Sequence, residues 1–182
     1  VVGGAGDDSF VGGEGDDTIV GGGGANRLLG ATGSDSIVSG FGNDTIDGGA
    51  DLDTLSYADR TDGFSIAFQT GTASTVSLGA GEFDSIVNIE NLIGGSGKDT
   101  ISAADDSVAH LLAGGDGSDS LVGGSGHDTL LGGSGDDTLD GGLGNDSIDG
   151  GSGVNMLSYA ARTIGLSVVF DASNAGTITL AS

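Results

Sequence analysis

The sequence predicts an all-β fold, a right-handed parallel β-roll in which short strands and tight turns wind into a solenoid. Two observations carry this prediction. A nine-residue pattern, G-G-x-G-x-D-x-U-x with U a large apolar residue, recurs through most of the chain, and a fixed short period is the signature of a repeat architecture. The composition agrees, since 40 of the 182 residues are Gly and none is Pro or Cys.

The nine-residue copies fall into two groups. Six copies fill residues 3–56 and six more lie within residues 94–158, with clear examples in GGEGDDTIV at 12–20 and GGSGDDTLD at 132–140. The eleven residues 103–113 fit one degenerate copy with two extra residues. Twelve copies in one phase exclude coincidence, so each copy is expected to form the same structural unit.

The last three residues of each copy, such as Thr18-Ile19-Val20, are expected to form a minimal strand, because β-branched residues favour strands. Alternation along a strand sends the eighth position inward. Glycines in the first six positions supply the turn, so two copies close one coil and copy n stacks on copy n+2 at about 4.8 Å. The predicted inward residues are Phe10, Ile19, Leu28, Ile37, Ile46, Leu55, Ile101, Leu121, Leu130, Leu139, Ile148 and Leu157.

This stacking brings the sixth-position Asp side chains of successive coils together. Two carboxylates at about 5 Å repel by about 3 kcal/mol at an effective dielectric constant of ~20. Calcium reverses the sign, because it takes carboxylate and backbone carbonyl oxygens as ligands. The sequence therefore predicts several bound Ca²⁺ ions that supply much of the folding free energy. The predicted metal ligands are Asp8, Asp17, Asp35, Asp44, Asp53, Asp99, Asp119, Asp128, Asp137 and Asp146.

The copies are not equally suited to hold an ion. Asp17 is expected to face Asp35, and Asp119 to face Asp137. Asn26 separates Asp8 from Asp44 in the stack and offers only one neutral side-chain oxygen. The weakest positions are therefore expected where Asn replaces the sixth-position Asp, as Asn155 also does.

Three further positions depart from the pattern. If residues 103–113 count as one turn, Asp99 faces Asp119 and His110 takes a ligand position. Asp51 replaces the fourth glycine of its copy, which makes that turn irregular. Acids at the fifth position are interpreted as solvent-facing, because other copies carry Asn, Ser or Lys there. Those acids are Asp7, Asp16 and Asp136.

A longer duplication overlies the short period, since residues 48–78 match residues 150–180 at an offset of 102. Residues 57–93, between the two groups of copies, are interpreted as a spacer that continues the solenoid with larger coils and with strands near 65–68 and 75–78. Whether the blocks form one roll or two rolls hinged at the spacer stays open. The predicted domains are a first repeat block at 1–56, the β-rich spacer at 57–93, a second repeat block at 94–158, and a second, truncated spacer at 159–182.

The duplication places Tyr57 and Arg60 opposite Tyr159 and Arg162. Both tyrosines are interpreted as residues that pack at the ends of the repeat blocks. For the two arginines the alternatives are capping of strand carbonyls, pairing with acids, or a plain surface position.

The charge and the missing motifs exclude several function classes. The formal net charge of −23 argues against nucleic acid and anionic membranes as partners, because both would be repelled. No apolar run approaches the length of a membrane span. Nucleophile-elbow, P-loop and dinucleotide motifs are absent, and His110 and His127 have no Cys or His at ligand spacing, so no enzyme is expected. The chain opens on Val1 without a signal peptide and is expected to be a piece of a longer protein.

With these repeats the chain resembles the RTX (repeats-in-toxin, hemolysin-type calcium-binding) family, whose signature is this nonapeptide. The resemblance implies a secreted bacterial protein, exported by a type I (ABC) transporter, that folds outside the cell where calcium is plentiful. Rolls of this family are attached to toxins, proteases, lipases, epimerases and large adhesins.

Three functions follow from the resemblance and the repeats. The tandem module favours a structural, adhesin-type extender. The alternative is the C-terminal secretion and folding region of an RTX enzyme or pore-forming toxin. An ice- or glycan-binding solenoid is disfavoured, because the outward seventh position mixes Ser and Thr instead of forming a regular Thr array.

Overall fold

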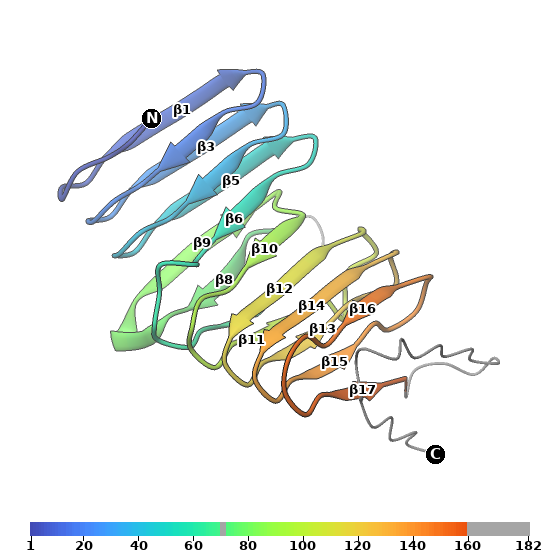
Figure 1. The fold of residues 1–182 in the computed structure, drawn as a ribbon. Coiled ribbons are helices and arrows are strands. Elements are labelled where there is room, and N and C mark those ends of the chain that lie inside the picture. The colour runs from blue at the N-terminus through green and yellow to red at the C-terminus, as the bar shows by residue number, and fades with distance from the viewer. Residues whose placement is uncertain (70–71, 160–182) are drawn as a thin grey trace.

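The computed structural model of the chain describes residues 1–69 and 72–159. Within these ranges the chain forms seventeen β-strands and a single 3₁₀ turn, Gly79–Gly81. The strands run across the long axis of the molecule and stack one coil upon the next (Figure 1). The predicted parallel β-roll is therefore confirmed. The same residues contain no helix that is long and apolar enough to cross a membrane.

Two sheets form the walls of the roll. The ten-stranded sheet has the order β1 (Ser9–Glu14), β3 (Arg27–Thr32), β5 (Thr45–Ala50), β9 (Phe83–Val87), β8 (Ser74–Ser77), β7 (Ser65–Ala67), β11 (Thr100–Ser102), β13 (Ser120–Val122), β15 (Thr138–Asp140) and β17 (Met156–Ser158). The seven-stranded sheet has the order β16 (Ser147–Asp149), β14 (Thr129–Ser134), β12 (Leu111–Asp116), β10 (Asn91–Ile93), β6 (Thr54–Ser56), β4 (Ser36–Val38) and β2 (Thr18–Val20).

The register follows the sequence period. Phe10 pairs with Leu28, and Ile19 pairs with Ile37, each in a parallel pair of strands eighteen residues apart. Copy n therefore stacks on copy n+2, as predicted. Strands such as β1 and β14 are longer than predicted and run on into the following glycines. There Gly13 keeps its pairing with Ala31 at a left-handed φ of 119°, which a glycine adopts without steric cost.

The core is a narrow row of apolar side chains between the two sheets. The predicted inward residues Ile19, Ile37 and Leu130 are all fully buried, and the row continues through the spacer. Phe10 and Leu157 lie at the two ends of this row and are only partly buried. About one large apolar residue per nonapeptide offsets little of the chain entropy, so the fold needs a further source of stability.

The spacer 57–93 belongs to both sheets. Strand β9 pairs with β5 and β10 pairs with β6, while β7 pairs with β11 of the second block. The two sheets thus run from one block to the next without a break, which answers the question that the sequence left open. Strand β8 is the exception to the parallel pattern, because it forms a hairpin with β7 and lies antiparallel to both β7 and β9.

The domain boundaries drawn from the repeat pattern stay predictions. Of the second spacer, only Tyr159 lies within the described residues, and Arg162 lies outside them.

Candidate metal centres in the turns

The sixth-position side chains form rows that run along the edges of the roll. The backbone N–H of Asp17 donates to Asp35 Oδ1 at 2.8 Å, and the N–H of Asp35 donates to Asp53 Oδ1 at 2.8 Å. In the second block the N–H of Asp119 donates to Asp137 Oδ1 at 2.9 Å. Each predicted facing pair thus meets through one carboxylate oxygen and the main chain of the coil before it.

The other carboxylate oxygen is left without a partner in many of these residues. Burial of an ionised oxygen without a hydrogen bond is costly, and such atoms are rare in folded proteins. A cation bound beside them would remove that cost. The buried Oδ2 atoms without a hydrogen-bond partner belong to Asp17, Asp35, Asp44, Asp53, Asp119 and Asp137, all of which the sequence proposed as ligands.

Backbone carbonyls converge on the same oxygens. A Cβ added to Gly30, the first glycine of its copy, would lie 2.1 Å from Asp35 Oδ2 and 2.3 Å from the carbonyl oxygen of Gly48. At Gly132 the corresponding distances are 2.5 Å to Asp137 Oδ2 and 2.6 Å to an oxygen of the next coil. The glycine therefore leaves room in which a carboxylate and a carbonyl oxygen come together.

This set of donors fits calcium. Hard carboxylate and carbonyl oxygens are the ligands that Ca²⁺ takes. Among residues 1–69 and 72–159, no three His, Cys, Asp or Glu side chains gather as a group that could hold a metal ion. An ion in these turns would therefore depend on backbone carbonyls as much as on the aspartates.

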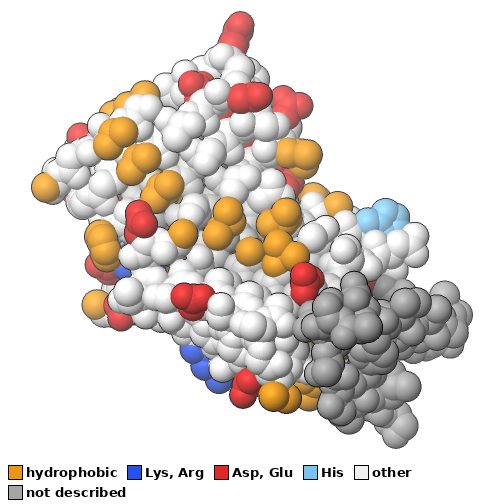
Figure 2. Space-filling view, in the orientation of Figure 1, with side chains coloured by type: hydrophobic (Ala, Val, Ile, Leu, Met, Phe, Trp, Pro, Cys, Tyr) orange, Lys and Arg blue, Asp and Glu red, His pale blue; other side chains and the backbone are white. Residues whose placement is uncertain are grey.

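The pKa values of the aspartates in these rows also favour a bound cation. Burial raises the pKa of Asp53 to about 6, and the charges of Asp35 and Glu90 add to the effect. Burial likewise raises the pKa of Asp119 and of Asp44 to about 6. Figure 2 shows acidic side chains spread over the visible face with few basic ones between them. In the absence of a cation, the charged carboxylates therefore oppose the fold.

In three other predicted ligands, Asp8, Asp99 and Asp128, the Oδ2 atom is hydrogen-bonded, and Asp146 Oδ1 accepts the N–H of Asp128 at 3.1 Å. Asp99 Oδ2 accepts the N–H of Gly95 at 3.2 Å, and Asp128 Oδ2 accepts the N–H of Gly124 at 2.8 Å. Asp8 accepts from the second glycine of its own copy in the same way. None of these second glycines has a left-handed φ, whereas in the copies with an unpartnered Oδ2 the second residue does, as Gly133 shows at 107°. In these nine copies an Oδ2 without a partner (an open carboxylate) therefore goes with a left-handed second residue, and a hydrogen-bonded Oδ2 (a closed carboxylate) does not.

Two members of the rows were missed in the sequence. The N–H of Asp44 donates to Asp84 Oδ1 at 2.8 Å, and the N–H of Asp53 donates to Glu90 Oε2 at 2.9 Å. Both acceptors lie in the spacer, outside the nine-residue phase. A signal was present, because Asp84-Ser85-Ile86-Val87 repeats the four residues from 35 to 38 letter for letter.

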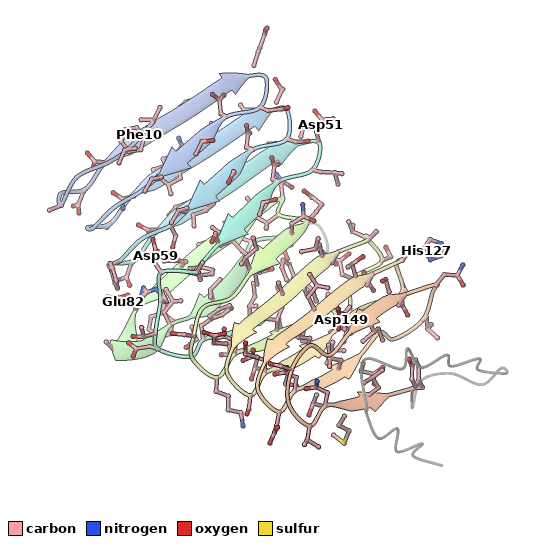
Figure 3. All side chains as sticks on the ribbon, in the orientation of Figure 1. Phe10, Asp51, Asp59, Glu82, His127 and Asp149 are labelled. Atoms are coloured by element: carbon pink, nitrogen blue, oxygen red, sulfur yellow. The ribbon has the colours of Figure 1, made fainter. Side chains whose placement is uncertain are left out.

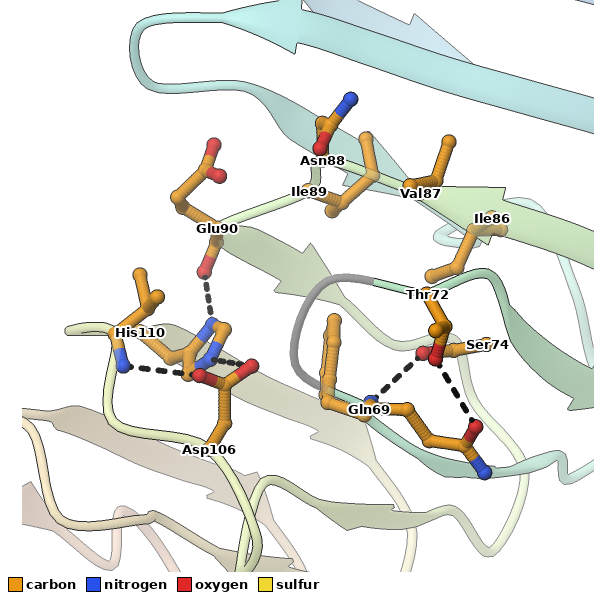
Figure 4. Close-up of a pocket in the computed structure, with 12 residues that line it drawn as sticks. Gln69, Thr72, Ser74, Ile86, Val87, Asn88, Ile89, Glu90, Asp106 and His110 are labelled. Atoms are coloured by element: carbon orange, nitrogen blue, oxygen red, sulfur yellow. Dashed lines mark hydrogen bonds and ion pairs between the residues drawn. The ribbon is translucent and has the colours of Figure 1, made fainter.

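His110 occupies the place of a sixth-position Asp in its row, as the sequence predicted if residues 103–113 count as one turn. Its N–H donates to Asp128 Oδ1 at 2.8 Å, and its Nδ1 lies 2.9 Å from the carbonyl oxygen of Glu90. A carbonyl only accepts, so Nδ1 carries the proton. Nε2 lies 3.5 Å from Asp106 Oδ2 at the wall of a cavity of about 100 Å³ (Figure 4). At this place the row therefore carries an imidazole instead of a carboxylate, and calcium prefers oxygen ligands to nitrogen.

The fifth-position acids are exposed, as interpreted, and they also accept hydrogen bonds from the backbone. Asp7 Oδ1 accepts the N–H of Ala25 at 2.7 Å, and Asp16 Oδ1 accepts the N–H of Ser34 at 2.9 Å. His127 Nδ1 does the same for the corresponding N–H of Asn145 at 2.8 Å. The fifth position thus binds the following coil, whereas the sixth position binds the preceding one.

Two further departures from the repeat have visible consequences. Asp51, in a turn at the edge of the stack (Figure 3), takes the left-handed φ of the glycine it replaces, at 81°, and accepts the N–H of Gly33 at 3.2 Å. Arg60 is buried, pairs with Glu82 and lies over the ring of Phe41, 5.0 Å from its centroid. Of the three roles considered for Arg60, pairing with an acid is the one observed.

Comparison with known proteins gives one family. A model of the RTX calcium-binding nonapeptide repeat matches residues 1–28, 20–55, 88–107, 111–139 and 122–157. No curated protein matches the chain. Solved structures that match include the extracellular lipase LipA from Serratia marcescens, with a TM-score of 0.40 and 19% sequence identity. That alignment covers 91% of this chain and 31% of the lipase chain, so the chain spans about a third of the lipase.

Proposed function

The chain belongs to the RTX calcium-binding nonapeptide repeat family, and from this premise we propose that it is a calcium-dependent folding module of a secreted bacterial protein. The observation that carries the proposal is the set of buried Asp Oδ2 atoms that have no hydrogen-bond partner and lie beside carbonyl oxygens of the next coil. Bound Ca²⁺ would supply positive charge, and the sixth-position aspartates and the backbone carbonyls beside them are the groups that would hold it.

The remaining steps belong to the chain itself. The sixth-position aspartates accept backbone N–H groups and so fix the spacing between coils. The first glycine of each copy keeps the carbonyl and the carboxylate close together. Without calcium the repulsion between carboxylates and the thin core favour the unfolded chain. The chain therefore stays unfolded where free calcium is scarce, which suits passage through a type I exporter, and folds outside the cell.

Within the parent protein, we assign the module to a structural role as an extender of adhesin type. The duplication at an offset of 102 residues and the sheets shared by both blocks support this assignment, because further modules can be added in the same register. The alternative is the C-terminal folding and secretion region of an enzyme or a pore-forming toxin. The sequence of the parent protein outside these residues distinguishes the two.

The test is far-ultraviolet circular dichroism of the chain in EGTA and then through a titration with Ca²⁺ to about 10 mM, which covers the affinity range of extracellular calcium modules. The expected result is a cooperative gain of β-signal with Ca²⁺ and none with Mg²⁺ at equal ionic strength. A chain that is already folded in EGTA, or that Mg²⁺ folds equally well, contradicts the proposal.

A further inference from the structure

We propose that Asp53, Glu90 and the backbone carbonyl of Asn88 form a calcium site that joins the last nonapeptide of the first block to the spacer. The proposal rests on the calcium-dependent folding proposed above. The junction site differs from the sites between stacked nonapeptides, because two of its three oxygen donors come from spacer residues that lack the repeat pattern.

The carboxylate of Asp53 is open toward this site. Asp53 is fully buried, and its Oδ1 accepts the N–H of Asp35 at 2.8 Å. Its Oδ2 is buried and has no hydrogen-bond partner. A buried carboxylate oxygen without a partner is rare in folded proteins, and a bound cation would account for it.

The carbonyl of Asn88 stands where a regular copy places the carbonyl of its first glycine. A Cβ added to Gly48 would lie 2.1 Å from Asn88 O and 2.6 Å from Asp53 Oδ2. One coil earlier, the same construction at Gly30 meets Gly48 O at 2.3 Å. The spacer therefore reproduces the pair of oxygens found between nonapeptides, with a different residue.

The conformation of Asn88 makes this possible. Its φ of 53° lies in the left-handed region, which Asn enters more readily than most residues. Its side-chain Nδ2 donates to Asp47 Oδ1 at 2.8 Å, which holds the residue against the coil below. The backbone turn at Asn88 is thus fixed by the first block itself.

Glu90 brings the second carboxylate. Its Oε2 accepts the N–H of Asp53 at 2.9 Å, the same bond that a sixth-position Asp makes in a regular coil. A calcium ion here would draw on a carboxylate from each side of the junction and on a backbone carbonyl, which are ligand types that calcium takes.

The opposite edge of the junction is built differently. There the N–H of Asp44 donates to Asp84 Oδ1, but Asp84 Oδ2 accepts the hydroxyl of Tyr57 at 2.8 Å. Ser39 replaces the first glycine of that copy and is fully buried. Asp44 Oδ2 on this edge also has no hydrogen-bond partner, but both oxygens of the spacer carboxylate facing it are hydrogen-bonded, so the junction site is assigned to the edge of Asp53 and Glu90.

The test counts calcium ions per chain, by equilibrium dialysis and elemental analysis, with circular dichroism as the check on folding. Glu90→Gln keeps an oxygen that can accept the N–H of Asp53 but removes the charge, and it is expected to bind one ion fewer than the wild type. Glu90→Asp, which restores a carboxylate, is expected to keep the full count. Glu14→Gln removes the same charge at an exposed position and is the matched control, also expected to keep the full count.

A wild-type ion count in folded Glu90→Gln overturns the junction site while the proposed calcium module stands. If Glu90→Gln fails to fold, Asp53→Asn replaces it, because Asn26 shows that an amide at this position still accepts the N–H of Asp8 at 2.9 Å. Asp53→Asn is expected to lose at least one ion, and an unchanged count overturns the site. A wild-type chain that binds no calcium overturns the proposed function together with the site.

Discussion

The hydroxyl of Tyr57 donates a 2.8 Å hydrogen bond to Asp84 Oδ2, whereas Asp44 Oδ2 in the same row has no hydrogen-bond partner. Tyr57 is buried and packs against Phe64, with the ring centroids 5.0 Å apart. Burial and the charge of Asp84 raise the pKa of Tyr57 well above its usual value, so the hydroxyl stays a donor. The packing role predicted for this tyrosine therefore includes a specific polar contact.

Tyr57→Phe should destabilise the roll, because it removes the donor from a buried carboxylate and leaves the ring packing intact. The expected loss is about 1–3 kcal/mol in the free energy of unfolding. Urea unfolding at saturating calcium measures it. Tyr159→Phe removes the same atom at the duplicate, partly exposed position and should cost less. Equal losses for the two variants would show that the bond to Asp84 has no special weight.

Asp35→Asn should weaken calcium binding and leave the coil spacing intact, since an amide oxygen can still accept the N–H of Asp17. Even changes outside the ligand shell of a metal cost about 10–100-fold in affinity, so at least about a tenfold loss is expected at this site. The calcium midpoint of the folding transition is the readout. Asp16→Asn removes an exposed fifth-position charge and should leave that midpoint nearly unchanged. If both variants shift it equally, general charge density controls folding.

Gly30→Ala should abolish the site above it, because the added Cβ would lie 2.1 Å from Asp35 Oδ2 and 2.3 Å from a backbone carbonyl. Gly4→Ala adds the same atom where nothing lies within 4 Å. Neither glycine has a left-handed φ, so the pair isolates the effect of space. Calcium titration followed by circular dichroism should show a higher midpoint for Gly30→Ala only. A normal midpoint for this variant would contradict the close approach.

Without calcium, mild acid should favour the folded roll. The pKa values of Asp44, Asp53 and Asp119 are raised from 3.8 to about 6 in the folded state, so this state binds protons more tightly than the unfolded chain. Stability from these groups is therefore greatest below pH 3.8 and is lost as the pH rises through about 6. Circular dichroism in EGTA should show more β-signal at about pH 5 than at about pH 7.5.

At saturating calcium the sign should reverse, because protons compete with the ion for the same oxygens. Measurements at about pH 5 stay above the isoelectric point of 4.1, which limits precipitation. A metal-free signal that does not change between the two pH values would mean that the carboxylates do not oppose folding.

The fixed period made the register predictable. Because two nonapeptides close a coil, the pairing of Ile19 with Ile37 and of Asp17 with Asp35 followed from counting residues. Asp84 was missed because it lies outside that phase, although its local sequence matches a regular copy. The antiparallel strand β8 could not be read from alternation, since a hairpin and a parallel coil share the same pattern.

The fifth-position hydrogen bonds were missed for a different reason. Replacement of the fifth-position acids by Asn, Ser or Lys in other copies was interpreted as a sign of solvent contact, and Asp7, Asp16 and Asp136 are indeed exposed. Asp16 and His127 nevertheless each use a side-chain acceptor atom on a backbone N–H of the next coil. Only the path of the chain in space shows that an exposed acceptor has a fixed donor within reach.

The unbroken sheets have a mechanical consequence. Because the strands lie across the long axis, their hydrogen bonds point along it, and a pull on the two ends loads these bonds one coil at a time. A roll of this kind should yield by peeling from an end, at low force and in regular steps. Ions that bind oxygens of neighbouring coils would strengthen the contacts between them, so the calcium concentration would set the tension at which the roll lengthens.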